Sequence, residues 1–166
     1  MVKGLLVREI CISIANQTLT TIENGETIKV FSVSTALNGP GEQNGTGQTP
    51  TGSHYVRAKI GGDQPKCSVF RGRRPTGEIY SDDLAKAYPK RDWILSRILW
   101  LCGKEVGKNR LGNVDTMARY IYIHGTPDTE AMGQALSHGC IRMRNDDVIE
   151  LFDWAPIQCP VLITKE

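Results

Sequence analysis

Polar and apolar residues alternate along several short segments of this 166-residue chain, a pattern typical of strands with one buried face. Alternation or β-branched content predicts strands over residues 9–14, 17–22, 27–34, 53–60, 67–70, 93–101, 119–123 and 159–164. Asn24-Gly25 predicts a tight hairpin between the second and third of these strands. Ile28, Val30 and Phe31 are then expected to pack inward.

Three other segments favour helices, namely residues 82–87, 129–136 and 146–154. Ser81 and Asn145 precede two of them and are residue types that cap helix N-termini. Residues 38–52 are rich in Gly, Pro and Asn and should form a surface loop. The pattern therefore predicts one mainly β domain over residues 1–166, with two or three short helices.

Composition narrows the class of protein. A hydrophobic content of 40% and a charged content of 23% are ordinary for a globular domain. The net charge of +2, without a long basic run, argues against nucleic acid, and no apolar window is long enough to cross a membrane. The short cluster Arg71-Gly72-Arg73-Arg74 is either a solvated loop or a site that captures a substrate carboxylate.

The cysteines are odd in number and widely spaced, which is not the pattern of a disulfide framework: Cys11, Cys67, Cys102, Cys140 and Cys159. Unpaired thiols favour a reducing compartment. Arg8 and Glu9 interrupt the apolar start of the chain, so it does not resemble a signal peptide. A cytoplasmic location is expected, or a periplasmic or cell-wall location if residues are missing before Met1.

The strongest chemical signal is the segment Ser137-His138-Gly139-Cys140-Ile141-Arg142, which follows a second histidine-glycine pair, His124-Gly125. A histidine that accepts the thiol proton produces a reactive sulfur nucleophile. Glycine beside the cysteine permits a tight turn and lets a substrate approach backbone N–H groups, which stabilise the oxyanion formed when a carbonyl is attacked. The spacing therefore points to acyl transfer through a thioester.

These two motifs, extended by Met143 and followed by Asp147-Val148 and Leu151-Phe152, resemble the signature of the L,D-transpeptidase catalytic domain, also called the YkuD domain. The segment Thr49-Pro50-Thr51-Gly52 resembles that family's threonine-proline-x-glycine segment. The resemblance extends from about Ile10 to Ile163. It implies a β-sandwich-like catalytic fold and no cofactor or metal.

The resemblance also implies a substrate, the peptide stem of peptidoglycan or a muropeptide. Such enzymes attack the bond between the diamino acid at stem position three and D-alanine at position four. An amine acceptor then gives a 3-3 cross-link or anchors a protein to the wall, whereas water gives a trimmed tripeptide. Carbapenem-type β-lactams are expected to acylate the same cysteine.

By position in the motif, the resemblance makes Cys140 the nucleophile and His124 the general base. The carbonyl of Gly125 is expected to orient the imidazole, as the third member of a serine protease triad does. His138 is expected to support the oxyanion, which the N–H groups of Gly139 and Cys140 would bind.

Substrate binding is assigned to Ser137, Tyr122 and Arg142, and Arg142 could instead shape the turn. Because side chains alternate along a strand, only one of Tyr120 and Tyr122 is expected to face the site. His54 lies outside the motifs and is expected at the surface.

Two other kinds of site are less consistent with the sequence. His124, His138 and Cys140 could supply at most three zinc ligands, and the last two are spaced more closely than the usual ligand pair. A muropeptide-binding module without activity would not need both Cys140 and His124. The preferred interpretation is a cytosolic L,D-carboxypeptidase that trims recycled tetrapeptides, with transpeptidation as the alternative.

Overall fold

The structure is a computed structural model that describes residues 4–166, and its architecture is mainly β, as the sequence predicts. Its strands are β1 (Arg8–Ser13), β2 (Thr18–Glu23), β3 (Glu26–Ser32), β4 (Gly52–Ile60), β5 (Ser68–Arg71), β6 (Arg74–Ile79), β7 (Ile94–Gly103), β8 (Tyr122–Gly125), β9 (Ile141–Met143) and β10 (Pro160–Thr164). Its helices are α1 (Asp82–Ala87), α2 (Asn145–Trp154) and the 3-10 helix η1 (Gly112–Val114).

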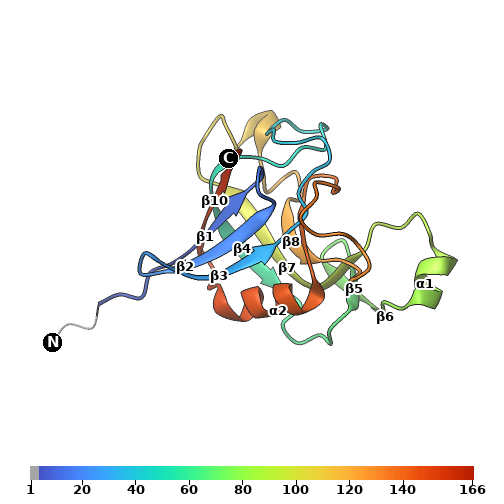
Figure 1. The fold of residues 1–166 in the computed structure, drawn as a ribbon. Coiled ribbons are helices and arrows are strands. Elements are labelled where there is room, and N and C mark those ends of the chain that lie inside the picture. Colours follow the sequence, from blue (N-terminus) through green and yellow to red (C-terminus); the bar gives the residue numbers. More distant parts are fainter. Residues whose placement is uncertain (1–3) are drawn as a thin grey trace.

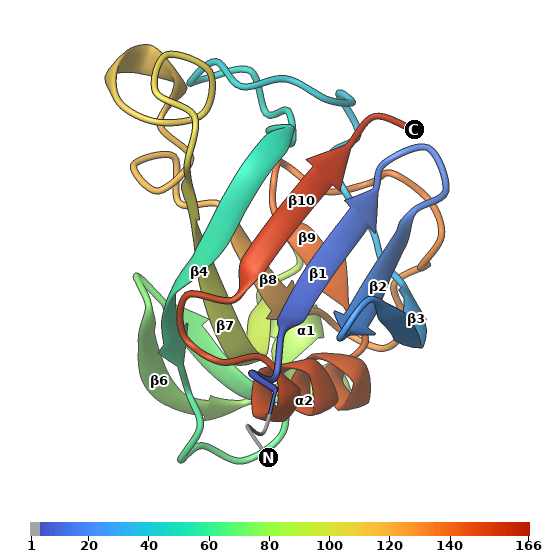
Figure 2. The same cartoon turned by 90° about the vertical axis from the view of Figure 1, so that its left-hand side faces the viewer.

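The strands form a sheet in the order β3-β2-β1-β10-β4-β7-β5-β6, with β8 paired to β7 and β9 paired to β8. The β1–β10 and β8–β9 pairs are parallel, and the other pairs are antiparallel. Figures 1 and 2 show that the sheet curls, so that β1, β2 and β10 form one layer with β7, β8 and β9 behind it. Helix α2 closes one end of the two layers, and α1 lies on an extension beyond β6.

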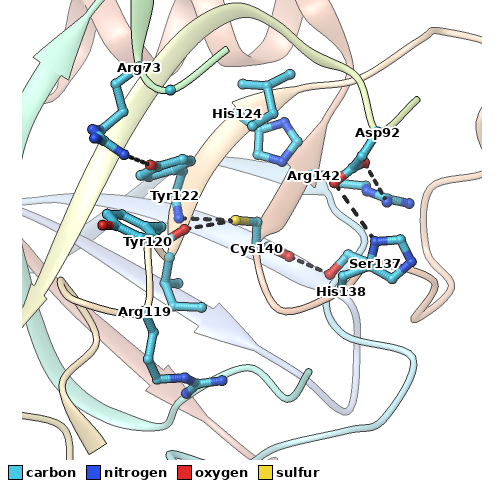
Figure 3. Close-up of a pocket in the computed structure, with 13 residues that line it drawn as sticks. Arg73, Asp92, Arg119, Tyr120, Tyr122, His124, Ser137, His138, Cys140 and Arg142 are labelled. Carbon is cyan, nitrogen blue, oxygen red and sulfur yellow. Dashed lines mark hydrogen bonds and ion pairs between the residues drawn. The ribbon is translucent and has the colours of Figure 1, made fainter. Parts of the chain in front are cut away.

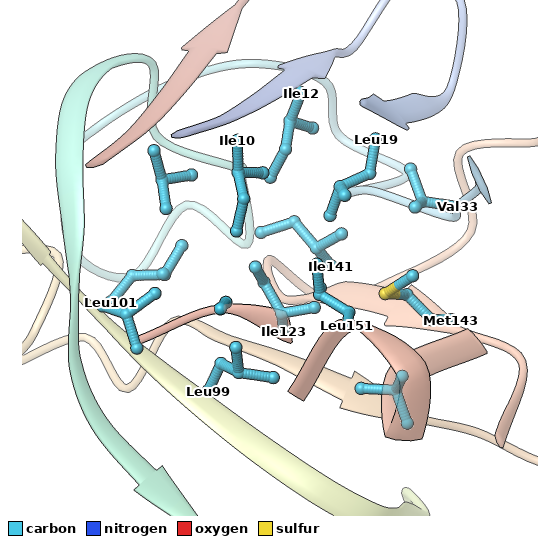
Figure 4. Packing of buried hydrophobic residues seen from close by; sticks show 14 of the residues in the cluster. Ile10, Ile12, Leu19, Val33, Leu99, Leu101, Ile123, Ile141, Met143 and Leu151 are labelled. Atoms are coloured by element: carbon cyan, nitrogen blue, oxygen red, sulfur yellow. The ribbon is translucent and has the colours of Figure 1, made fainter. Parts of the chain in front are cut away.

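The hydrophobic core fills the space between these layers. Ile10, Ile12 and Leu19 reach it from β1 and β2, while Leu99 and Ile123 reach it from β7 and β8 (Figure 4). All five are at most 1% exposed. Complete burial of such aliphatic side chains contributes about 1.5–3 kcal/mol each. The core therefore holds β8 and β9 firmly against the rest of the sheet.

The Asn-Gly hairpin is confirmed, because Asn24 and Gly25 both have positive φ angles, 50° and 80°. The face expected for β3 is wrong. Phe31 is buried opposite Leu19, but Ile28 and Val30 are more than half exposed. Side chains alternate along a strand, so Val30 points away from the face that Phe31 takes, and Ile28 lies unpaired where the β2–β3 register shifts.

Three other local expectations are corrected. Residues 129–136 form bends and irregular backbone instead of a helix, and Gly133, with φ 81°, donates its N–H to the Val33 carbonyl. β8 begins only at Tyr122, because Tyr120 has a positive φ of 57° that breaks the strand. Asn145 is the first residue of α2 instead of its N-cap, which is Arg144.

Candidate active site

A cavity of about 350 Å³ opens where β8 runs beside the turn that leads into β9. The parallel register pairs Ile123 with Ile141 and His124 with Arg142. Cys140, directly before β9, is thereby held beside Tyr122, whose N–H lies 3.3 Å from the Cys140 Sγ. Cys140 and His124, sixteen residues apart in sequence, thus line one cavity (Figure 3).

The sulfur of Cys140 rests as a protonated thiol. It accepts the Tyr122 N–H and donates to the carbonyl oxygen of Tyr120 at 3.4 Å. Burial raises the pKa of this thiol to about 11, mainly because the thiolate would lose hydration. A base is therefore needed to remove its proton at neutral pH.

His124 is 2% exposed, and its Nδ1 lies 2.7 Å from the Gly125 carbonyl oxygen, which is the contact expected from the motif. A carbonyl oxygen only accepts, so Nδ1 carries the proton and Nε2 keeps its lone pair. Burial lowers the pKa of this imidazole, which favours the neutral ring. Figure 3 shows the ring and the Cys140 sulfur facing into the same cavity. The neutral ring can accept a proton there.

At the end of β8, the neighbouring atoms leave no room for a side chain on residue 125, so this position requires glycine. A Cβ on this residue would lie 2.5 Å from the Leu95 carbonyl oxygen and 2.6 Å from Asn145 Oδ1. Asn145 is itself buried, donates to the Thr126 carbonyl and accepts from Ser96. Asn145 was expected to cap a helix, and it instead fixes the backbone that follows His124.

The side of the cavity lined by Asp92, Ser137, His138, Cys140 and Arg142 is called the cysteine wall here, together with Thr49, Glu130 and Gly139, which contact these residues from outside the cavity lining. Gly139 has a positive φ of 133°, a conformation that favours glycine. Ser137 Oγ donates to the Cys140 carbonyl at 2.6 Å and accepts the Gly139 N–H at 3.2 Å. Buried Thr49 donates to the Gly139 carbonyl at 2.8 Å. These hydrogen bonds hold the turn that carries the thiol.

Three expectations for this turn remain predictions. Ser137 was assigned to substrate binding; it lines the cavity, although it is 1% exposed and both contacts of its hydroxyl lie within the turn, so this assignment stays a prediction. The Gly139 N–H points to Ser137 in this structure, so its role toward an oxyanion remains a prediction. His138 is exposed, and its Nδ1 lies 3.8 Å from Asp92 Oδ2, so its supporting role also remains a prediction.

Arg142 lies in the cysteine wall with its side chain only 11% exposed. Its guanidinium is 3.2 Å from an Asp92 oxygen and 3.4 Å from a Glu130 oxygen. Sequence left open whether Arg142 shapes the turn or holds a carboxylate. Two acidic partners favour the structural role, and no sequence signal pointed to Asp92 or Glu130.

The opposite side of the cavity, lined by Arg73, Tyr120 and Tyr122, is called the arginine wall here, together with Trp100, which packs against Arg73. The Arg73 guanidinium lies 4.9 Å from the Trp100 ring centre and 4.7 Å from the Tyr120 ring centre, and it donates to the Tyr122 hydroxyl at 3.0 Å. Both tyrosines line the cavity, so the expectation that only one would do so is wrong. The positive φ of Tyr120 removes the strand alternation on which it rested.

Arg119 also lines the cavity, and the sequence reading missed it. His54 is buried instead of exposed, with its ring nitrogens 2.9 Å from the Gly52 carbonyl and 2.9 Å from Thr116 Oγ1. Burial lowers the pKa of His54 to about 4. Within residues 4–166, no group of three or more His, Cys, Asp or Glu side chains is placed to hold a metal ion. No helix in this range is both long and apolar enough to span a membrane.

This fold is that of a known class, the L,D-transpeptidase catalytic domains. A family model of the YkuD L,D-transpeptidase catalytic domain matches residues 7–163, and the chain belongs to this family.

Related proteins agree with this membership. The Bacillus subtilis (strain 168) protein YkuD is 29% identical over 156 residues, which cover 94% of this chain and 65% of YkuD. YqjB from the same organism is 47% identical over 51 residues, covering 31% of this chain and 29% of YqjB. The chain spans less than two thirds of the length of either relative.

Solved structures show the same fold. L,D-transpeptidase 3 from Mycobacterium tuberculosis superimposes with a TM-score of 0.59 at 18% identity, over 96% of this chain and 61% of that chain. A structure of the same protein with a faropenem-derived adduct gives a TM-score of 0.58 at 19% identity, over 96% of this chain and 60% of that chain. The L,D-transpeptidase LdtMt1 in complex with imipenem gives 0.57 at 19% identity, over 96% of this chain and 59% of that chain.

Proposed function

We propose that this domain transfers the acyl group of a peptidoglycan tetrapeptide stem through a thioester on Cys140. The observation that carries this proposal is the buried His124 ring, fixed by the Gly125 carbonyl and facing the same cavity as the Cys140 thiol. Family membership supports the choice of this substrate class. The Tyr122 N–H, which contacts the sulfur, is an additional donor beside the reacting atoms.

In the proposed reaction, Nε2 of His124 takes the thiol proton while the Cys140 sulfur attacks the carbonyl of the diamino acid. The tetrahedral intermediate collapses when the imidazolium returns that proton to the nitrogen of D-alanine, which leaves as a free amino acid. The peptide is then a thioester on Cys140. An incoming water or amine gives its proton to His124, attacks the thioester and regenerates the thiol.

Water is the acceptor that we propose as usual, which makes the enzyme an L,D-carboxypeptidase of muropeptide recycling in the cytosol. All five cysteines, each within the described part of the chain, are unpaired, which suits a reducing compartment. Transpeptidation is the second candidate, favoured by the activity after which the family is named. The two reactions share every step up to the thioester.

Carbapenems are proposed to acylate Cys140. The support is the faropenem-derived adduct on one structural neighbour and the imipenem complex of another. A β-lactam carbonyl requires the same thiol and the same base as a stem peptide.

The test is product analysis of a disaccharide-tetrapeptide in water enriched in oxygen-18, with Cys140→Ala as the matched control. Hydrolysis predicts a tripeptide with one oxygen-18 in its new carboxylate, together with D-alanine. Cross-linked dimers without this label as the main product would contradict the carboxypeptidase proposal and support transpeptidation. Tetrapeptide that is bound but never cut would refute the enzymatic function.

A further inference from the structure

Three arginines line the cavity, and they differ in what their guanidinium groups contact. Arg142 faces the carboxylates of Asp92 and Glu130. Arg119 donates to three backbone carbonyls of the loop before β4, at 2.6 to 3.3 Å. The charge of Arg142 is therefore balanced within the protein, and the N–H donors of Arg119 are occupied by backbone carbonyls.

Arg73 differs from both. Among residues 4–166, no carboxylate lies within ion-pair distance of its guanidinium. Its one hydrogen-bond partner is the neutral hydroxyl of Tyr122, whose pKa is raised by burial, so no phenolate balances the charge. A guanidinium has five N–H donors, so most of those on Arg73 remain available.

The position of Arg73 is nevertheless well defined. Gly72 and Arg73 form the two-residue connection between β5 and β6, and both have positive φ angles, 55° and 64°, as a type I′ turn requires. The guanidinium lies over the rings of Trp100 and Tyr120 and makes cation–π contacts with both. Arg71 and Arg74, on either side of the turn, are exposed and do not line the cavity.

Tyr122 connects this cation to the reaction centre. Its backbone N–H contacts the Cys140 sulfur, and its hydroxyl at the far end of the side chain contacts Arg73. The sulfur and the guanidinium therefore contact opposite ends of the same tyrosine (Figure 3). A group that reaches it must be several bonds removed from the carbonyl that the sulfur attacks.

We propose that Arg73 binds a carboxylate at the distal end of the acyl donor's side chain and so determines which stem peptides are used. This inference rests on the proposed function, because it places the attacked carbonyl at Cys140. The donor it selects carries a diamino dicarboxylic acid whose distal carboxylate is free. A donor in which that carboxylate is amidated, or in which the side chain ends in an ammonium alone, is disfavoured.

The physical reason is charge pairing in a partly enclosed site. A planar guanidinium binds a carboxylate through two parallel hydrogen bonds, whereas a carboxamide offers one neutral acceptor. Solvent reaches Arg73, so the discrimination is expected to be moderate, roughly tenfold in kcat/KM.

The experiment compares two tetrapeptides that differ only in a distal carboxylate or carboxamide. Wild-type enzyme should prefer the acid roughly tenfold in kcat/KM. Arg73→Gln should lose this preference by slowing on the acid alone, while Arg73→Lys should retain part of it. Arg74→Gln, the neighbouring exposed arginine, is the matched control and should keep the full preference.

The same comparison is made for binding, with both peptides titrated into Cys140→Ala and into Cys140→Ala combined with Arg73→Gln. This arm needs no turnover, so it tests the inference even if the proposed reaction fails. Tighter binding of the acid that disappears with Arg73→Gln supports the inference. Equal affinity for acid and amide in Cys140→Ala, or a preference that survives Arg73→Gln, would overturn it.

Discussion

The two walls of the cavity are built on different principles. In the cysteine wall, hydrogen bonds of Ser137 and Thr49 close the turn around Cys140, and Arg142 lies between two carboxylates. In the arginine wall, Arg73 rests on aromatic rings and contacts no acid among the described residues. The polar and charged groups of the cysteine wall pair with one another, whereas the arginine wall presents a guanidinium without an acidic partner to the cavity.

This difference indicates that the cysteine wall positions the reacting atoms and that the arginine wall recognises the substrate. Preorganised polar groups hold reacting atoms in place without cost at the moment of reaction. A cation without an acidic partner gains most when a substrate supplies the missing carboxylate. Changes in the cysteine wall should therefore lower stability and turnover together, whereas changes in the arginine wall should alter substrate preference alone.

The largest effect is expected at the base that serves the cysteine wall. His124→Asn should reduce kcat by about a hundredfold to ten-thousandfold, because the partly buried thiol, whose pKa is raised to about 11, loses its proton acceptor. Steady-state kinetics on a tetrapeptide measures this. His138→Asn is the comparison variant at the same cavity; because His138 is exposed and is expected to support the oxyanion instead of accepting the thiol proton, it should lose less than His124→Asn. A larger loss at His138 than at His124 would exchange their roles.

The second effect concerns the charge state of the thiol. Because burial raises the pKa of Cys140 to about 11, the thiolate fraction should grow with pH throughout the range below that value. Alkylation of Cys140 by iodoacetamide should then accelerate about tenfold per pH unit between pH 7 and pH 9. Peptide mass spectrometry separates this cysteine from the other four. A rate that is already constant from pH 6 upward would show a preformed thiolate–imidazolium pair instead.

Thr49→Val tests whether the turn depends on its internal hydrogen bonds. Thr49 Oγ1 accepts the Ala36 N–H at 3.0 Å and donates to the Gly139 carbonyl, so valine leaves two buried backbone groups without these partners. We expect a loss of about 1–3 kcal/mol in the free energy of unfolding, together with lower kcat. Urea denaturation and kinetics measure the two. Thr49→Ser keeps the hydroxyl and should restore most of both. Wild-type stability in Thr49→Val would contradict the role of this residue.

The smallest effect is expected for Arg142→Gln. Loss of the contacts with Asp92 and Glu130, both partly exposed, should cost about 1 kcal/mol, or a fall in Tm of about 2–4 °C. The preference for an acidic over an amidated stem peptide should be unchanged. If Arg142→Gln abolished that preference while Tm stayed constant, the carboxylate receptor would lie in the cysteine wall instead.

Sequence alone predicted those elements that depend on local pattern. The alternation of residues 9–14 identified β1, and Ser81 caps α1 as expected, with its Oγ accepting the Leu84 N–H. The motif identified Cys140, His124 and Gly125 as neighbours, and the structure brings them to one place. Each of these signals lies within a few residues of the feature it predicts, or in a motif with fixed spacing.

The remaining features depend on contacts that sequence spacing does not encode. Asp92 lies fifty residues before Arg142, and only the fold brings their side chains together. Residues 129–136 have helical composition, but hydrogen bonds to other segments hold them in bends and irregular backbone. The pairing of Phe31 with Leu19 gives the inward face of β3 to Phe31, so its neighbour Val30 points outward. Tertiary context overrides local preference in such cases.

The central claim is that Cys140 carries the peptide as a thioester, and rapid acid quench followed by intact-protein mass spectrometry tests it most directly. With a tetrapeptide donor, we expect an adduct of tripeptidyl mass on wild-type protein, located to the peptide that contains Cys140. Cys140→Ala should form no adduct and lose turnover by at least about a thousandfold. Undiminished turnover in Cys140→Ala, or an adduct on a different residue, would contradict the account.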